Sequence, residues 1–163
     1  MSSTTILSPG KLIEVARPLV ATQAFSANAT ARSRIERIAM NAVRKREESA
    51  GCRVVDVSVQ KCGWDLTSHP PAVDGRYPES RHIEVKGRVK GAATITVTRN
   101  EILCAFNQGE KFVLAIVFVN EDDSCEGPFY VRQPFAREPD WRESAIIYEV
   151  RHLLSLAESG NIR

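Results

Sequence analysis

The segment "RHIEVKGR" at residues 81–88 carries side chains that could take part in hydrolysis. Its alternation predicts a short β-strand with Ile83 and Val85 on one face. Glu84 and Lys86 then share the other face, roughly 6–7 Å apart along the strand. Such a pair could be a surface ion pair worth about 0–1 kcal/mol. It could equally be half of a metal-dependent nuclease site, depending on what the chain brings near it.

Asp65 is the residue best placed to complete such a site. It falls in a predicted strand at 63–68, and a hairpin connection to the next strand can place it beside Glu84. Metal-dependent phosphodiester cleavage needs clustered oxygen ligands for Mg²⁺ or Mn²⁺ and a cation near the attacking water. Asp65, Glu84 and the backbone carbonyl of Val85 are therefore candidate metal ligands, and Lys86 is the candidate catalytic cation. This pattern is degenerate, and Asp65 could instead cap a turn.

Other charged residues could support the same chemistry. Glu36 stands three residues after Ser33, so a capping box at a helix start explains it, although it is also a candidate catalytic acid. Glu47, eleven residues further along that helix, is a rival for this role. Glu101 begins another predicted helix, where an acid is favoured electrostatically, and could also support the metal ligands or contact substrate. The candidate phosphate-binding cations, which could also simply aid solubility, are Lys61, Arg88, Lys90 and Arg99.

These residues need elements to position them, and the periodicities predict an α/β domain with a mixed sheet. A helix is expected from Ser33 to Gly51, and a second from Thr98 to Gly109 with a capping box. Strands are expected at 53–60, 63–68, 81–88, 93–98, 111–120 and 129–135, followed by an extended segment and a terminal helix. The Pro- and Gly-rich stretch before residue 81 predicts a hairpin loop. Trp64, Trp141 and Tyr148 are expected to be packing residues, with base stacking the lesser alternative for Trp64.

Length and composition favour one soluble domain. The chain has 163 residues, 43% hydrophobic and 26% charged. Residues 1–31 differ from the rest: helical periodicity is interrupted at Pro18, and "SANATARS" reads as a small-residue linker. We therefore expect an N-terminal arm or linker at 1–31 and the folded domain at 32–163. The arm could pack on the domain or on another subunit, so homo-oligomerisation is open.

Charge and cysteine usage bear on partners and compartment. Net charge is +2, but residues 76–99 hold six Lys and Arg against two Glu, which suits DNA, although a solvated strand face would look similar. The four cysteines form no C-x-x-C, and the three histidines show no zinc-ligand spacing. No signal peptide or membrane-spanning run is present. We therefore expect the protein in a reducing cytoplasm, and we expect no membrane partner.

Four segments together resemble a known family: "RIERIAM", "GWDLTS", "IEVKGR" and "TVTRNEILCAFN". They are similar to the NO VEIN C-terminal-like domain, found at the ends of helicases and in prokaryotic defence proteins, within the PD-(D/E)xK nuclease superfamily. The resemblance covers roughly residues 33–153. It implies a restriction-endonuclease-like core with a mixed central β-sheet flanked by helices. It also implies that Asp65 and Glu84 bind metal, that Lys86 is catalytic and that Glu36 is the helix acid.

The expected function is therefore a Mg²⁺- or Mn²⁺-dependent DNA nuclease in phage defence or DNA processing. The helicase motor that usually accompanies the family cannot fit in the 32 upstream residues, so two alternatives are open: the chain acts alone, or its partner is a separately encoded helicase or ATPase. The alternative is a catalytically inactive nucleic-acid-binding or protein-docking module of a multi-protein defence system.

Overall fold

The computed structural model describes residues 10–157, with side chains from residue 28 onward. It separates into two compact units, Met1–Arg34 and Ile35–Arg163, and the second contains all the strands of the described chain.

Helix α1 (Gly10–Ser49) is longer than the sequence suggests. It is continuous through Pro18, where the sequence predicted an interruption, and through the alanine-rich stretch at 26–33, whereas the arm or linker predicted at 1–31 stays a prediction. Alanine has the highest helix propensity of all residues, and such a stretch therefore suits a helix as well as a linker. Ser33 lies inside the helix and is not its N-cap. This also removes the capping-box explanation of Glu36.

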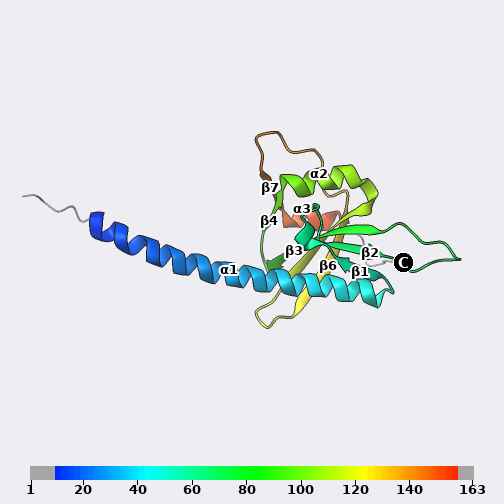
Figure 1. The fold of residues 1–163 in the computed structure, drawn as a ribbon, viewed down its shortest axis with the longest axis horizontal. Coiled ribbons are helices and arrows are strands. Elements are labelled where there is room, and N and C mark those ends of the chain that lie inside the picture. The colour runs from blue at the N-terminus through cyan, green and yellow to red at the C-terminus, as the bar shows by residue number, and fades with distance from the viewer. Residues whose placement is uncertain (1–9, 158–163) are drawn as a thin grey trace, which may run out of the picture. The chain divides into compact units, whose positions relative to one another are not determined.

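Five strands form the central sheet in the order β1, β2, β3, β5, β6 (Figure 1). Their bounds are β1 (Arg53–Asp56), β2 (Leu66–His69), β3 (Arg81–Val89), β5 (Phe112–Val119) and β6 (Cys125–Arg132). β3 and β5 are parallel, whereas the other neighbouring strands are antiparallel. Helix α2 (Arg99–Gln108) lies in the crossover that a parallel connection requires. The sheet is therefore mixed, as predicted.

A second sheet has two strands, and the first of them lies in the same crossover. It pairs β4 (Thr94–Thr98) with β7 (Ala145–Glu149) in antiparallel register. Helix α3 (Val150–Ser155) continues directly from β7, and two 3₁₀ turns, η1 (Ser58–Gln60) and η2 (Gly109–Lys111), complete the described elements.

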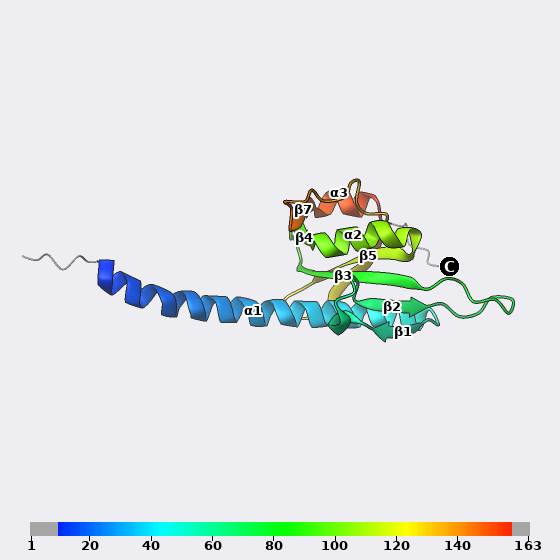
Figure 2. The ribbon, with the colours of Figure 1, turned by 45° about the horizontal axis from the view of Figure 1, so that its top comes forward.

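Helices cover both faces of the central sheet, and the residues of β5 divide between two cores. Val113, Ala115 and Val117 pack with Ala39 and Val43 of α1. The intervening Leu114 and Ile116 pack with the residues Ile95, Val97, Ile102, Ala105 and Leu153 of β4, α2 and α3. Figure 2 shows α2 and α3 on one side of the sheet and the last turns of α1 on the other. The prediction of a mixed sheet flanked by helices is confirmed.

Several predicted strand ends are wrong by a few residues. β1 ends at Asp56 because the Asp56 carboxylate accepts hydrogen bonds from the backbone N–H and hydroxyl of Ser58, which turns the chain. β2 begins only at Leu66, since Gly63 adopts φ +100° in the preceding turn. β6 starts earlier than predicted because the turn-like "CEGP" stretch still pairs with β5, with an irregularity in the register.

Gly87 allows α1 to lie close to β3. A Cβ at this position would lie 2.8 Å from Ala39 Cβ and 3.0 Å from the carbonyl oxygen of Ile35. Because helix backbone and a buried alanine yield little, Gly87→Ala is expected to destabilise the domain by about 1–3 kcal/mol, measured by urea unfolding. Combining it with Ala39→Gly should reveal a coupling of about 0.5 kcal/mol or more. Strictly additive losses would contradict the close contact.

Candidate active site

Asp65 stands at the point where β2 stops pairing with β3. Its backbone N–H still donates to the carbonyl of Ile83 at 2.9 Å. Its side chain then fills the hydrogen-bonding position that the backbone of a longer β2 would take. Asp65 Oδ2 accepts a hydrogen bond from the N–H of Val85 at 2.9 Å. The irregular start of β2 therefore fixes the Asp65 carboxylate against the middle of β3, next to Glu84.

Glu84 and Lys86 point from β3 toward α2. They face the same side as Leu114 and Ile116, their register partners on β5. Lys86 Nζ lies 2.8 Å from Glu84 Oε1 and 2.7 Å from an oxygen of Glu101. The ammonium group is thus held between two carboxylates from different elements.

Glu101 joins this group because of how α2 begins. Thr98 accepts a hydrogen bond from the N–H of Glu101, and Glu101 Oε2 accepts one from the N–H of Thr98, so the predicted capping box is confirmed. The same Oε2 contacts Lys86 Nζ. Glu101 therefore contacts Lys86 directly, and its supporting role stays a prediction. Asp65, Glu84, Lys86 and Glu101 are called the acidic–lysine cluster below.

Burial sets the protonation of the acidic–lysine cluster. It raises the pKa of Glu84 to about 8; Lys86 opposes this shift, while the charges of Asp65 and Glu101 add to it. Burial also raises the pKa of Asp65, against the opposing effects of the Val85 N–H and Lys86. For Lys86, burial acts to lower the pKa, but Glu84 and Glu101 outweigh it and the pKa is raised. The cluster contains three carboxyl groups and one ammonium group, so the positive charge of Lys86 does not balance the carboxylates around it.

The donor set fits one divalent ion bound by oxygen. The N–H and carbonyl of one strand residue point to the same edge, so the Val85 carbonyl faces the side on which its N–H meets Asp65. Asp65, Glu84 and this carbonyl would hold the ion, since Mg²⁺ commonly uses one or two carboxylates and keeps several waters. Across the described residues, no three His, Cys, Asp or Glu side chains are grouped so as to hold a metal together. Glu101 is instead engaged with Lys86.

Glu36 and Glu47 of α1 lie on the other side of the sheet. Glu36 is exposed, and its neighbours Ile35 and Ala39 lie against Gly87 on the face opposite Glu84. The structure therefore does not bring Glu36 to the acidic–lysine cluster. Glu47, its rival, is fully buried on this opposite face and is likewise separate from the cluster.

Glu47 instead organises a buried polar network. Its carboxylate accepts hydrogen bonds from the hydroxyls of Ser68 at 2.5 Å and Tyr130 at 2.7 Å. It also forms an ion pair with the guanidinium group of Arg81. Burial, followed by the charge of Glu47, raises the pKa of Tyr130 well above its usual range, which keeps the phenol as a donor. Sequence reasoning weighed Glu47 only as a catalytic acid, and its helical spacing gave no sign of these partners.

The predicted phosphate-binding cations are dispersed around the site. Lys61 is exposed in the turn that leads to Asp65, and Arg99 opens α2. Arg88 follows Lys86 on β3 and donates to the carbonyl of Gly87. Lys90 is paired with Glu126 on the surface. Their contact with phosphate stays a prediction.

The aromatic residues separate into two kinds. Trp64 stacks on His82, with centroids 4.1 Å apart, and donates to Thr67, so its predicted packing role is confirmed. Tyr148 packs against the core beside Phe135, also as predicted. Trp141 is 75% exposed, so its prediction as a core anchor is wrong. The loop that carries it lies on the surface, which its sequence alone does not reveal.

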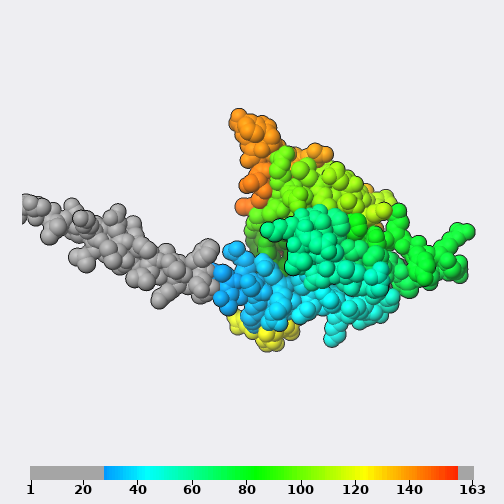
Figure 3. All heavy atoms as spheres, viewed as in Figure 1, coloured from blue at the N-terminus to red at the C-terminus, as the bar shows by residue number. Residues whose placement is uncertain are grey.

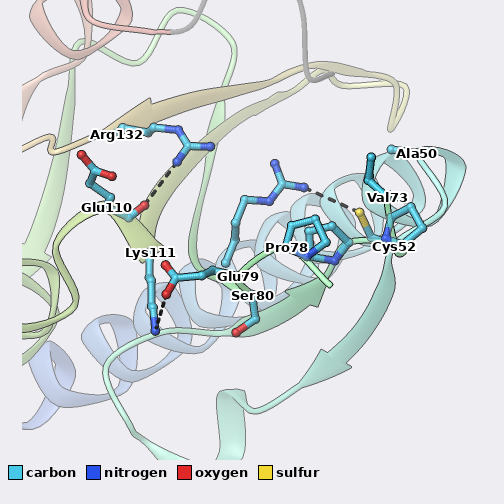
Figure 4. A pocket seen from close by; sticks show the side chains of 12 residues that line it. Ala50, Cys52, Val73, Pro78, Glu79, Ser80, Glu110, Lys111 and Arg132 are labelled. Atoms are coloured by element: carbon cyan, nitrogen blue, oxygen red, sulfur yellow. Dashed lines mark hydrogen bonds and ion pairs between the residues drawn. The ribbon is translucent and has the colours of Figure 1, made fainter. Parts of the chain in front are cut away.

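Two concave regions lie away from the acidic–lysine cluster. One, of about 350 Å³, lies beneath the hairpin loop between β2 and β3, where Cys52, Pro78 and Lys111 are among the lining side chains (Figure 4). The other lies beside Lys90 and α3. Neither region is lined by a residue of the acidic–lysine cluster, so neither shows where a substrate would bind at the cluster. All four cysteines are free.

A family model described as "Protein NO VEIN, C-terminal" matches residues 35–131, which is more than half of the chain. The chain belongs to this family. The match spans α1 from Ile35, all of β1 to β5 and most of β6, so every residue of the acidic–lysine cluster lies inside the NO VEIN C-terminal domain. No curated protein and no solved structure matches the chain.

Within residues 10–157, the helices lack the combination of length and apolarity that spanning a bilayer would need.

Proposed function

We propose that the acidic–lysine cluster hydrolyses phosphodiester bonds of DNA with Mg²⁺ or Mn²⁺. The observation that carries the proposal is the convergence of Asp65, which directly precedes β2, with Glu84 and Lys86 of β3, where the lysine ammonium lies 2.8 Å from a buried carboxylate. Burying this many charges is costly unless a bound ion compensates for them. The restriction-endonuclease-like core implied by the family resemblance is part of the same proposal, and the mixed sheet flanked by helices supports it.

Each side chain has a role that its position allows. Asp65, Glu84 and the Val85 carbonyl would hold the ion, which when bound lowers the pKa of a coordinated water and offsets charge on the phosphate. Lys86 would orient the attacking water or stabilise the charge that develops on the phosphate oxygens. Glu101 would fix the Lys86 side chain, because it approaches Nζ from α2 on the side away from β3.

Cleavage of plasmid and single-stranded DNA by the purified chain tests the proposal. We expect products with Mg²⁺ or Mn²⁺, none with EDTA, and none from the Asp65→Asn variant. Cleavage that survives in Asp65→Asn would point to a contaminating nuclease and refute this site.

We further propose that the domain works in DNA processing or phage defence beside a separately encoded helicase or ATPase.

One observation favours an inactive module instead. Lys86 is already paired with Glu84 and Glu101, so its ammonium group has carboxylate partners without any bound metal. Calorimetric titration with Mn²⁺ distinguishes the two functions. A nuclease site should bind the ion and lose binding in Asp65→Asn, whereas a closed structural network should bind none in either protein.

Metal affinity should depend on pH with a defined sign. With a pKa of about 8, Glu84 is mainly protonated below that pH in the metal-free protein. An incoming ion must displace this proton, so Mn²⁺ affinity should rise with pH, by about tenfold per unit below pH 8, and level off above it. Titrations at pH 6.5, 7.5 and 8.5 in buffers of different ionisation enthalpy would count the released proton. An affinity independent of pH would exclude Glu84 as a ligand.

A further inference from the structure

Trp141 is an exposed aromatic side chain next to a cation. It is 75% exposed, and the guanidinium carbon of Arg142 lies 4.6 Å from the centroid of its ring. A cation–π contact of this kind covers one face of the indole and leaves the other free to stack. Trp and Arg are enriched among the residues that dominate the energy of binding interfaces.

The loop that carries Trp141 is stabilised by hydrogen bonds between its own residues. Arg137 and Glu143 form two hydrogen bonds of 2.8 Å each, and Glu143 also accepts from the N–H of Asp140 at 2.7 Å. The Arg137 partner, followed by this N–H, lowers the pKa of Glu143 to about 2, so the Glu143 carboxylate is ionised at neutral pH and available to Arg137. The loop, residues 136–144, forms the orange projection beside α2 in Figure 3.

The same loop is anchored to the helix end that holds Lys86. The N–H of Arg99 donates to the carbonyl of Ser144 at 2.8 Å, and the Arg99 side chain donates to the carbonyl of Asp140, the residue before Trp141. Arg99 directly follows Thr98, whose N–H shares the Glu101 carboxylate with Lys86. A short chain of bonded residues therefore joins Trp141 to the proposed catalytic centre.

The acidic–lysine cluster itself is only narrowly open. The side chains of Lys86, Glu84 and Glu101 are 12%, 6% and 17% exposed. A flexible strand can lead one phosphate into such an opening more easily than an undistorted duplex can. Single strands also present unstacked bases, which bind to exposed aromatic rings without regard to sequence.

We propose that Trp141 and Arg142 form a stacking platform for a base of single-stranded nucleic acid bound at the acidic–lysine cluster. The inference rests on the proposed function, whose substrate class it narrows. The base lies on the free face of Trp141, and Arg142 holds the ring and contributes positive charge next to the strand.

Binding measured in EDTA tests the platform apart from any cleavage. Anisotropy of a labelled oligo(dT) strand should show that Trp141→Ala binds about 5- to 150-fold more weakly than wild type, with Trp141→Phe close to wild type. Ile147→Ala is the matched control, since Ile147 is 69% exposed on the nearby strand β7 and should leave binding unchanged. A duplex of the same length should bind more weakly and be insensitive to Trp141→Ala.

Intrinsic fluorescence gives a second readout that does not depend on folding of an alanine variant. Trp64 is half-buried against His82, so quenching by oligo(dT) should come from Trp141 and disappear in Trp141→Phe. Equal affinity of wild type and Trp141→Ala, or no binding of oligo(dT) by wild type, overturns the platform and leaves a protein partner as its occupant. Loss of binding in Trp141→Ala without metal-dependent cleavage by wild type would retain the platform and refute the nuclease.

Discussion

Glu84→Gln is expected to lower metal-dependent DNA cleavage by about 10²–10³-fold or more. Gln keeps the size of the side chain in its buried position but supplies a neutral ligand and a weaker partner for Lys86. Initial rates on a labelled strand, with Mn²⁺ saturating for wild type, measure the loss. Glu79→Gln is the matched control, because the Glu79 side chain is 76% exposed in the hairpin loop and its rate should equal that of wild type.

Lys86→Ala separates the role of the cation from that of the metal ligands. Its cleavage rate should fall by a similar factor, since no ammonium remains beside the phosphate. Mn²⁺ affinity, however, should be kept or increased, because Lys86 lies 2.8 Å from Glu84 and competes with the ion for this carboxylate. Loss of Mn²⁺ binding in Lys86→Ala would mean that the lysine organises the site instead of acting in the reaction.

Local signals in the sequence predicted much of the arrangement of the acidic–lysine cluster. Alternation predicted β3 with Glu84 and Lys86 on one face, and a Thr–Glu spacing predicted the start of α2. Both depend on residues close together in the chain. The sequence also predicted that Asp65 lies beside Glu84, because a hairpin brings consecutive strands together.

Contacts between distant elements could not be found in this way. The approach of Glu101 to Lys86 depends on how α2 crosses the sheet between β3 and β5. Trp141 lies in a surface loop that is joined to α2 by the hydrogen bond from Arg99 to the carbonyl of Asp140, a contact between residues 41 positions apart. The apparent helix start at Ser33 misled because capping residues also occur inside helices, where a preceding alanine-rich stretch continues the pattern.

Glu47→Ala is expected to cost about 3–5 kcal/mol of unfolding free energy. The substitution leaves the guanidinium group of Arg81, 12% exposed, without its carboxylate partner. It also leaves the hydroxyls of Ser68 and Tyr130 without their buried acceptor. Urea unfolding at constant pH measures the loss. Glu48→Ala, at the exposed next position of α1, should change stability by no more than about 0.5 kcal/mol.

Glu47→Gln distinguishes a structural acid from a catalytic one. The amide keeps the shape and one acceptor oxygen but loses the charge facing Arg81, so stability should fall while the folded protein cleaves DNA at the wild-type rate. This follows because Glu47 lies on the face of α1 and Tyr130, opposite Glu84 and Lys86. The reverse outcome, lost cleavage with unchanged stability, would make Glu47 the helix acid of the reaction and would require α1 to reach the other face of the sheet.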